Sequence, residues 1–87
     1  MFYVYGAKSS KATDKAVLLL ETAKQPYRLF ILGEDYTVMQ LLRLVPDTDS
    51  VPHIFDGTNY VGGTKDLYDY LYSMVKFENE GEDDGKN

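Results

Sequence analysis

The sequence predicts a single α/β domain in which a mixed four-stranded sheet is flanked by three helices on both of its faces, in the order β-α-β-α-β-β-α. Short segments rich in aromatic and β-branched residues alternate with segments whose apolar residues recur at helical spacing. Two strands joined through a helix run parallel and two strands joined by a tight turn run antiparallel, so the sheet is mixed. A chain of 87 residues leaves room for one domain only.

The first half of the chain predicts strand, helix and strand. Strands are expected at Phe2–Tyr5 and Tyr27–Leu32, and each is followed by a glycine. Between them, Ser9 or Ser10 supplies an N-cap oxygen for a helix that ends before Pro26. The apolar residues of this helix recur at helical spacing and are Ala12, Ala16, Leu19, Leu20 and Ala23.

A second helix is expected between Asp35, which can cap it, and Pro46, which ends it. Its apolar residues gather on one side and are Val38, Leu41, Leu42 and Val45.

The last third of the chain predicts a hairpin and a third helix. The strands His53–Phe55 and Asn59–Val61 flank Asp56-Gly57-Thr58, a sequence typical of a tight turn. After Gly62-Gly63, Thr64 can cap a helix. The apolar face of this helix consists of Leu67, Tyr70, Leu71 and Met74.

The negative charge of the chain is concentrated at its C-terminal end. Residues 77–87 hold five acidic residues and one lysine, a net −4, which leaves −1 of the total −5 for the rest of the chain. This composition predicts a domain at 1–76 followed by a disordered acidic tail. The tail either keeps the chain in solution or attracts a basic partner. Nucleic acid is not expected as a partner, because no basic stripe is present.

The chain has no cysteine and one histidine, His53. This composition excludes disulfides and cysteine-based zinc sites, so no metal is expected, and His53 is interpreted as a structural residue. The longest apolar run, Val17–Leu20, is too short to cross a bilayer, and the first residues lack the features of a signal peptide. A cytoplasmic monomer is therefore expected.

Three local signatures point to a known family. They are Tyr3-Val4-Tyr5-Gly6 before a short loop and a helix, then Ser50-Val51-Pro52-His53-Ile54-Phe55, then Tyr60-Val61-Gly62-Gly63-Thr64-Lys65-Asp66-Leu67. Together they resemble glutaredoxin, a small protein of the thioredoxin fold, over most of residues 2–76. The compactness is similar to that of the short glutaredoxins of bacteriophages and prokaryotes. The resemblance implies a thioredoxin fold and a thiol–disulfide oxidoreductase activity linked to glutathione.

The resemblance aligns the family's Cys-Pro-Tyr-Cys with Ser10-Lys11-Ala12-Thr13. A glutaredoxin attacks disulfides with a thiolate that a helix N-terminus stabilises. An alcohol at Ser10 cannot form a disulfide, and Thr13 cannot resolve one. As written, the chain has no catalytic residue for this reaction. One interpretation is that Ser10 and Thr13 only cap and begin a helix. The other is that Ser10 replaces the nucleophilic cysteine of an oxidoreductase.

The resemblance also implies a ligand groove that does not depend on sulfur. Pro52 takes the place of the family's cis-proline, and the backbone of Val51 would pair with an extended peptide such as glutathione. Gly63 and Thr64 would receive an anion at a helix start, whereas Lys65 replaces a frequent acid of the family. Lys8 and Lys11 lie close to the same loop, where they either pair with a ligand carboxylate or are ordinary solvated lysines. The candidate ligand-binding residues are Lys8, Ser10, Lys11, Val51, Pro52, Gly63, Thr64, Lys65 and Asp66.

These observations favour a glutaredoxin-like binding module without redox activity. It would bind an extended peptide, a glutathione-like thiol or a protein partner, with no resident cofactor. One alternative is the oxidoreductase described above. Another is a phage-type regulatory protein that binds a host factor through Tyr68 and Tyr72, on one flank of the last helix. Simple packing at the core edge is the competing interpretation of these two tyrosines.

Overall fold

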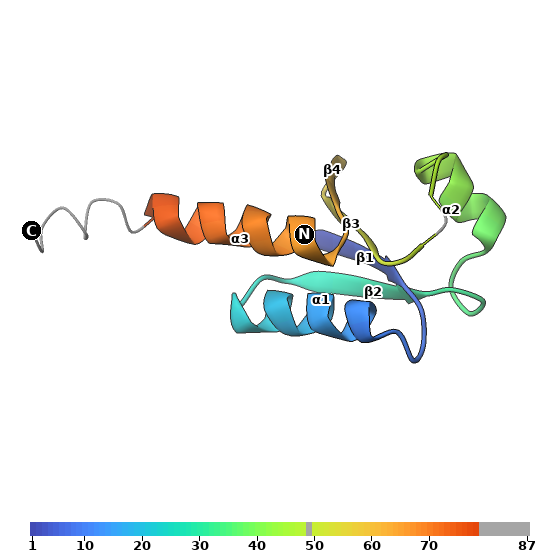
Figure 1. Ribbon diagram of the computed structural model, residues 1–87, viewed down its shortest axis with the longest axis horizontal. Coiled ribbons are helices and arrows are strands. Elements are labelled where there is room, and N and C mark those ends of the chain that lie inside the picture. The colour runs from blue at the N-terminus through green and yellow to red at the C-terminus, as the bar shows by residue number, and fades with distance from the viewer. Residues whose placement is uncertain (49, 79–87) are drawn as a thin grey trace, which may run out of the picture.

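A computed structural model describes residues 1–48 and 50–78 of the chain (Figure 1). The elements are β1 (Phe2–Gly6), α1 (Lys11–Thr22), β2 (Tyr27–Ile31), α2 (Val38–Leu44), β3 (His53–Asp56), β4 (Asn59–Gly62) and α3 (Thr64–Glu78). Their order confirms the predicted α/β fold with a mixed four-stranded sheet. Residues 77 and 78, which the sequence assigns to the acidic tail, belong to α3, and residues 79–87 of that tail lie outside the described residues.

The strand order in the sheet is β2-β1-β3-β4. The central strand β1 pairs in parallel with β2, where Val4 lies opposite Leu29. It pairs antiparallel with β3, where Val4 lies opposite Ile54. β3 and β4 form the predicted hairpin, and its turn contains Gly57 at a φ of 64°, a conformation that costs glycine little.

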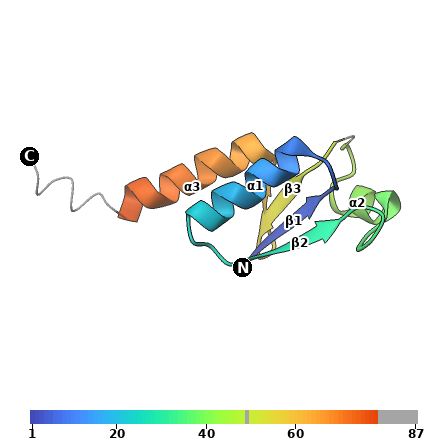
Figure 2. The same cartoon turned by 90° about the horizontal axis from the view of Figure 1, so that it is seen from below.

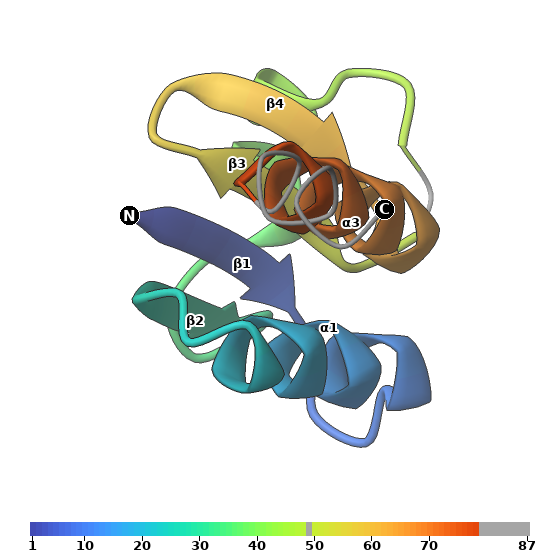
Figure 3. The same ribbon diagram turned by 90° about the vertical axis from the view of Figure 1, so that its left-hand side faces the viewer.

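The main hydrophobic core lies between the sheet and the helices α1 and α3, which run side by side on one sheet face (Figures 2 and 3). Its buried members are Phe2, Val4, Ala16, Leu20, Ile54, Leu67 and Leu71. Leu20, Ile54 and Leu67 have no exposed surface. Full burial of such a side chain stabilises a fold by about 1.5–3 kcal/mol, so this layer dominates the packing energy.

The apolar stripe of α1 differs by one position from the predicted one. Thr13, Ala16 and Leu20 are the buried residues of the helix, whereas Ala12, which the pattern assigned to the core side, is exposed. Residues three or four apart share a helix face. Thr13 lies seven positions before Leu20, close to two full turns, and therefore shares its side of the helix, whereas Ala12 lies eight positions before Leu20 and is rotated toward the outside.

The start of α2 was wrongly predicted. Thr37, and not Asp35, is the N-cap, because Thr37 and Gln40 form a reciprocal capping box with N···O distances of 3.2 and 2.9 Å. Asp35 instead accepts a hydrogen bond from the backbone N–H of Ile31 at 2.8 Å. The helix is consequently short, and Leu41 is its only buried residue, while Val38 is exposed.

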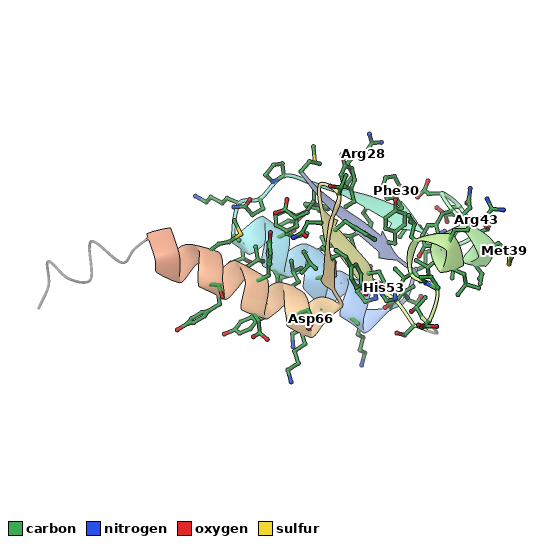
Figure 4. All side chains as sticks on the ribbon, turned by 90° about the horizontal axis from the view of Figure 1, so that it is seen from above. Arg28, Phe30, Met39, Arg43, His53 and Asp66 are labelled. Atoms are coloured by element: carbon green, nitrogen blue, oxygen red, sulfur yellow. The ribbon has the colours of Figure 1, made fainter. Side chains whose placement is uncertain are left out.

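The second face of the sheet is covered only at one end, by α2. Helices therefore lie on both faces, as expected, but two of the three cover the first face. α2 lies beyond the end of the sheet, and its Leu44 reaches this face beside Tyr3, Tyr5 and Phe55 (Figure 1). Figure 4 labels two residues from each of the elements near this face, Arg28 and Phe30 on β2 and Met39 and Arg43 on α2. The aromatic residues of this face are Tyr3, Tyr5, Phe30, Phe55 and Tyr60.

The start of α3 also differs from the prediction. Thr64 is the first helical residue, and the N–H of the preceding Gly63 donates to the Asp66 carboxylate at 3.0 Å. The predicted apolar face is confirmed, because Leu67 and Leu71 are buried while Tyr70 and Met74 pack against the core. No helix within the described ranges combines the length and apolar character needed to span a membrane.

Candidate functional site

Three loops meet at one end of the sheet. β1 leaves the sheet after Gly6, and β3 enters beside it, since His53 pairs with Tyr5. β4 ends at the same place, because Gly62 pairs with Ile54. The register thus brings the loop before α1, the residues before β3 and the start of α3 to a single end of the molecule (Figure 2).

Two contacts join these segments directly. The Thr64 hydroxyl donates to the carbonyl oxygen of Ala12 at 2.7 Å and links the first turns of α1 and α3. A Cβ atom added to Gly63 would lie 3.7 Å from the Pro52 carbonyl oxygen, so the loop before β3 runs against the start of α3. The structure therefore brings these three of the predicted segments together.

Ser10 and Thr13 form the beginning of α1. The Ser10 hydroxyl oxygen accepts a hydrogen bond from the Thr13 N–H at 3.1 Å, and the Thr13 hydroxyl accepts one from the Ala7 N–H at 3.2 Å. Thr13 is buried against Gly6, where any Cβ would collide with its side chain. The Ser10 hydroxyl therefore satisfies a backbone donor that the helix start would otherwise leave unpaired, and the Thr13 hydroxyl satisfies one in the loop between β1 and α1.

Val51 and Pro52 precede β3. The peptide bond between them is cis. Pro52 is buried, while Val51 is half-buried and borders a cavity of about 200 Å³ beside Leu41. Within the described part of the chain, neither the N–H nor the C=O of Val51 has a hydrogen-bond partner. These two groups remain available to an added strand.

Polar groups at the start of α3 are partly used within the chain. The Asp66 carboxylate accepts from the Gly63 N–H, and the approach is so close that a Cβ on Gly62 would collide with Asp66. Gly62 has a φ of 126°, which only glycine adopts readily. Since Thr64 already donates to α1, Lys65 is the exposed cationic group at this helix start.

The two lysines of the first loop differ in their surroundings. Lys8 forms an ion pair with Glu34, whose hydrogen bond and charge raise the pKa of the Lys8 ammonium group. Lys11 is exposed at the first position of α1. Sequence reasoning missed Glu34, because nothing in the spacing of the two residues indicates that their loops meet. Lys8 must break this pair before its charge can serve a ligand.

His53 is a structural residue in the described fold. It is 7% exposed, and its Nδ1 lies 2.7 Å from the Tyr60 hydroxyl, while its Nε2 contacts the Thr48 hydroxyl. Burial, and then the charge of Asp66, raises the pKa of Tyr60. The sequence offers no signal that the His53 ring contacts the Tyr60 hydroxyl. No cluster of three His, Asp or Glu side chains suited to a metal occurs among residues 1–48 and 50–78.

Comparison with known proteins identifies the fold. No protein-family model matches the chain, and no curated protein matches it. Among solved structures, the buckwheat glutaredoxin–glutathione complex matches with a TM-score of 0.67 and 17% identity, over 91% of this chain and 69% of that one. The holo form of glutaredoxin C1 from Populus tremula × tremuloides matches with a TM-score of 0.62 and 16% identity, over 85% and 78%.

These likenesses define a class of fold. Two glutaredoxin structures superpose on most of the described chain, although few residues are identical. The chain therefore has a glutaredoxin-like fold. At this identity the comparison establishes the fold alone, since one fold hosts many functions.

Proposed function

We propose that this chain is a binding module of glutaredoxin-like fold that lacks thiol–disulfide activity. Its ligand is an extended peptide, a glutathione-like thiol or a segment of a protein partner, held where the three loops meet. The observation that carries the proposal is the hydrogen bonding of Ser10 and Thr13 at the start of α1.

The chemistry of this helix start supports the absence of redox activity. A disulfide-exchange reaction needs a thiolate that attacks sulfur and a leaving thiolate. The chain has no cysteine, and the hydroxyls of Ser10 and Thr13 both accept hydrogen bonds from backbone N–H groups. These contacts support a capping role for Ser10 and a loop-anchoring role for Thr13.

The backbone of Val51, which has no partner among residues 1–48 and 50–78, supports a binding role. An extended peptide that pairs with the Val51 N–H and C=O gains main-chain hydrogen bonds whatever its side chains are. Lys11 and Lys65 lie on the first turns of α1 and α3, which the Thr64 hydroxyl ties together. Their charges favour a ligand that carries a carboxylate near the paired segment.

A titration with reduced glutathione, followed by NMR, tests the site. We expect saturable shifts of backbone amides at Ser10, Val51 and Thr64, with Tyr27 at the opposite end of β2 unmoved as an internal reference. The Lys65→Gln variant should bind more weakly than the Lys24→Gln variant, in which another exposed lysine, at the opposite end of α1 from these loops, is changed. The absence of shifts around Val51 would contradict the proposal.

An insulin or glutathione-disulfide reductase assay tests the absence of redox activity. We expect the chain to show no turnover above buffer, because no group on it can form a mixed disulfide. Measurable turnover would contradict a binding-only role.

The position of the Ser10 hydroxyl favours a second candidate, an oxidoreductase whose nucleophile is replaced. The Thr13 N–H that meets Ser10 Oγ would stabilise a thiolate at the same place. On this view, Ser10→Cys should form a mixed disulfide with glutathione that mass spectrometry detects, whereas Ser9→Cys, one residue outside the helix, should react more slowly. Equal reaction of the two variants would remove this candidate.

A third candidate is a regulatory protein that uses the outer flank of α3. Tyr68 and Tyr72 are 54% and 58% exposed, and their rings stack at 6.4 Å. Exposed tyrosines of this kind are enriched at protein interfaces. If glutathione causes no shifts at the loops, this flank becomes the preferred site for a protein partner.

A further inference from the structure

A separate groove runs between the outer sides of α1 and α3. Its volume is about 590 Å³, within the range of small-molecule sites. The helices α1 and α3 pack against each other here, on the side turned away from the sheet (Figure 2). The lining residues come from both helices and are Ala12, Lys15, Leu19, Thr64, Lys65 and Tyr68.

The lining combines an apolar surface with positive charge. Ala12, Leu19 and the ring of Tyr68 offer carbon atoms to a ligand. Lys15 and Lys65 contribute one ammonium group from each helix, and no Asp or Glu lines the groove among the described residues. Residues 1–76 carry a net charge of only −1, so two lysines without a lining acid give the groove a local positive charge. Lysine stems also extend apolar surface while their charged ends stay in water.

We propose that this groove binds an amphiphilic anion, a molecule with one acidic head group and an apolar body. The head group lies between Lys15 and Lys65, and the body covers Leu19 and the ring of Tyr68. A small hydrophilic anion would leave the apolar surface unused. A neutral apolar molecule would leave the two charges without a counterion, and a cation would be repelled.

The groove adjoins the site of the proposed function but does not depend on it. Thr64 and Lys65 belong to both, whereas Lys15 and Leu19 belong to the groove alone and Tyr68 also belongs to the α3 flank of the third candidate. An amphiphilic anion in the groove should therefore weaken binding of a ligand at the loops. Lys15 and Tyr68 variants separate the two sites, because they leave Val51 and Ser10 unchanged.

The first test uses the dye 8-anilino-1-naphthalenesulfonate, which carries an aromatic body and one sulfonate. We expect saturable binding with NMR shifts at Ala12, Leu19 and Tyr68. Decanoate should displace the dye, whereas decanol and decyltrimethylammonium at equal concentration should not. Shifts confined to the aromatic sheet face at Tyr5 and Phe30, or binding that does not saturate, would overturn the proposal.

Matched variants provide the second test. Lys15→Gln and Lys65→Gln should each weaken the decanoate affinity by about two- to five-fold, as expected for exposed ion pairs, while Lys24→Gln should not. Tyr68→Ser should weaken it further than Tyr72→Ser, because Tyr72 stacks on Tyr68 but does not line the groove. The proposal would be overturned if each groove variant bound decanoate as tightly as its matched control, Lys24→Gln for the lysines and Tyr72→Ser for Tyr68→Ser. The glutathione shifts at Val51 report on the other site in the same samples.

Discussion

The two faces of the sheet present different side chains and receive different cover. One face carries aliphatic residues such as Val4 and Ile54, which α1 and α3 bury completely. The other carries aromatic residues such as Tyr5 and Phe30, and only the end of this face meets α2. The first face is organised by burial between layers, and the second by contacts among its own rings.

Ring contacts give the second face its order without a covering helix. Tyr5 stacks on Phe30 with 5.0 Å between centroids and meets Tyr36 and Phe55 edge-on at 5.3 and 5.9 Å. The guanidinium of Arg28 lies 5.8 Å from the centre of the Phe30 ring. Such pairs contribute about 0.5–1.5 kcal/mol each, less than full burial of a large side chain. The comparison predicts that stability depends mainly on the first face.

The largest effect is expected from Ile54→Ala on the first face. Ile54 has no exposed surface, so the change removes buried methyl groups and leaves a cavity. We expect a loss of roughly 3 kcal/mol in the free energy of unfolding, measured by urea denaturation, and about 1 kcal/mol for the Ile54→Val control. If Ile54→Ala lowered the free energy of unfolding by less than Ile54→Val does, Ile54 would not belong to the main core.

A smaller effect is expected from Tyr5→Ala on the second face. The residue is half-buried and its ring meets three others, so we expect a loss of roughly 1.5 kcal/mol in the same assay. Tyr5→Phe keeps the ring and should cost much less. If Tyr5→Ala destabilised the chain as much as Ile54→Ala, the two faces would be equivalent, and the comparison would fail.

The smallest effect concerns pH and the junction between α2 and the sheet. The buried Tyr36 hydroxyl donates to the Gly6 carbonyl oxygen at 2.8 Å, and burial raises the pKa of Tyr36 above its usual value of 10.0. A raised pKa in the folded state means that this contribution to stability is complete below pH 10 and is lost as pH rises through the folded value. Ionisation would also remove the donor to Gly6.

The variant Tyr36→Phe checks this dependence. Its free energy of unfolding should be lower near neutral pH, because the hydrogen bond is absent. Between about pH 9 and 11, the free energy of unfolding of the variant should fall less steeply than that of the unchanged chain. This range covers about one pH unit on either side of the ordinary tyrosine pKa. Urea denaturation at each pH, with tyrosinate absorbance, measures both quantities. If the free energies of unfolding of the two chains fell in parallel with pH, ionisation of Tyr36 would not contribute to the pH dependence, and the prediction would be wrong.

Local patterns predicted most of the fold. The strands, the hairpin at Gly57 and the apolar face of α3 follow from periodicity and turn residues, which act within a few positions along the chain. The start of α2 was mispredicted because two nearby residues are both suitable helix caps. Asp35 and Thr37 are both good caps, and only the Gln40 side chain decided for Thr37.

The candidate site was predicted in its parts and not in its contacts. Ser10 as a cap and Val51 beside Pro52 follow from local sequence and from the family resemblance. The Lys8–Glu34 ion pair, the Thr64–Ala12 hydrogen bond and the use of Asp66 by Gly63 do not. Each of these depends on where a loop or helix start ends up in space, which periodicity does not encode.

By itself, the sequence determined that these 87 residues include no cysteine thiol and that the strands and helices follow the order β-α-β-α-β-β-α. Only the tertiary structure decided which hydroxyls and carboxylates are already hydrogen-bonded and which backbone groups lack a partner among the described residues. It also decided that two lysines from separate helices border one groove. Composition and spacing act locally along the chain, whereas these features arise from the packing of elements distant in sequence.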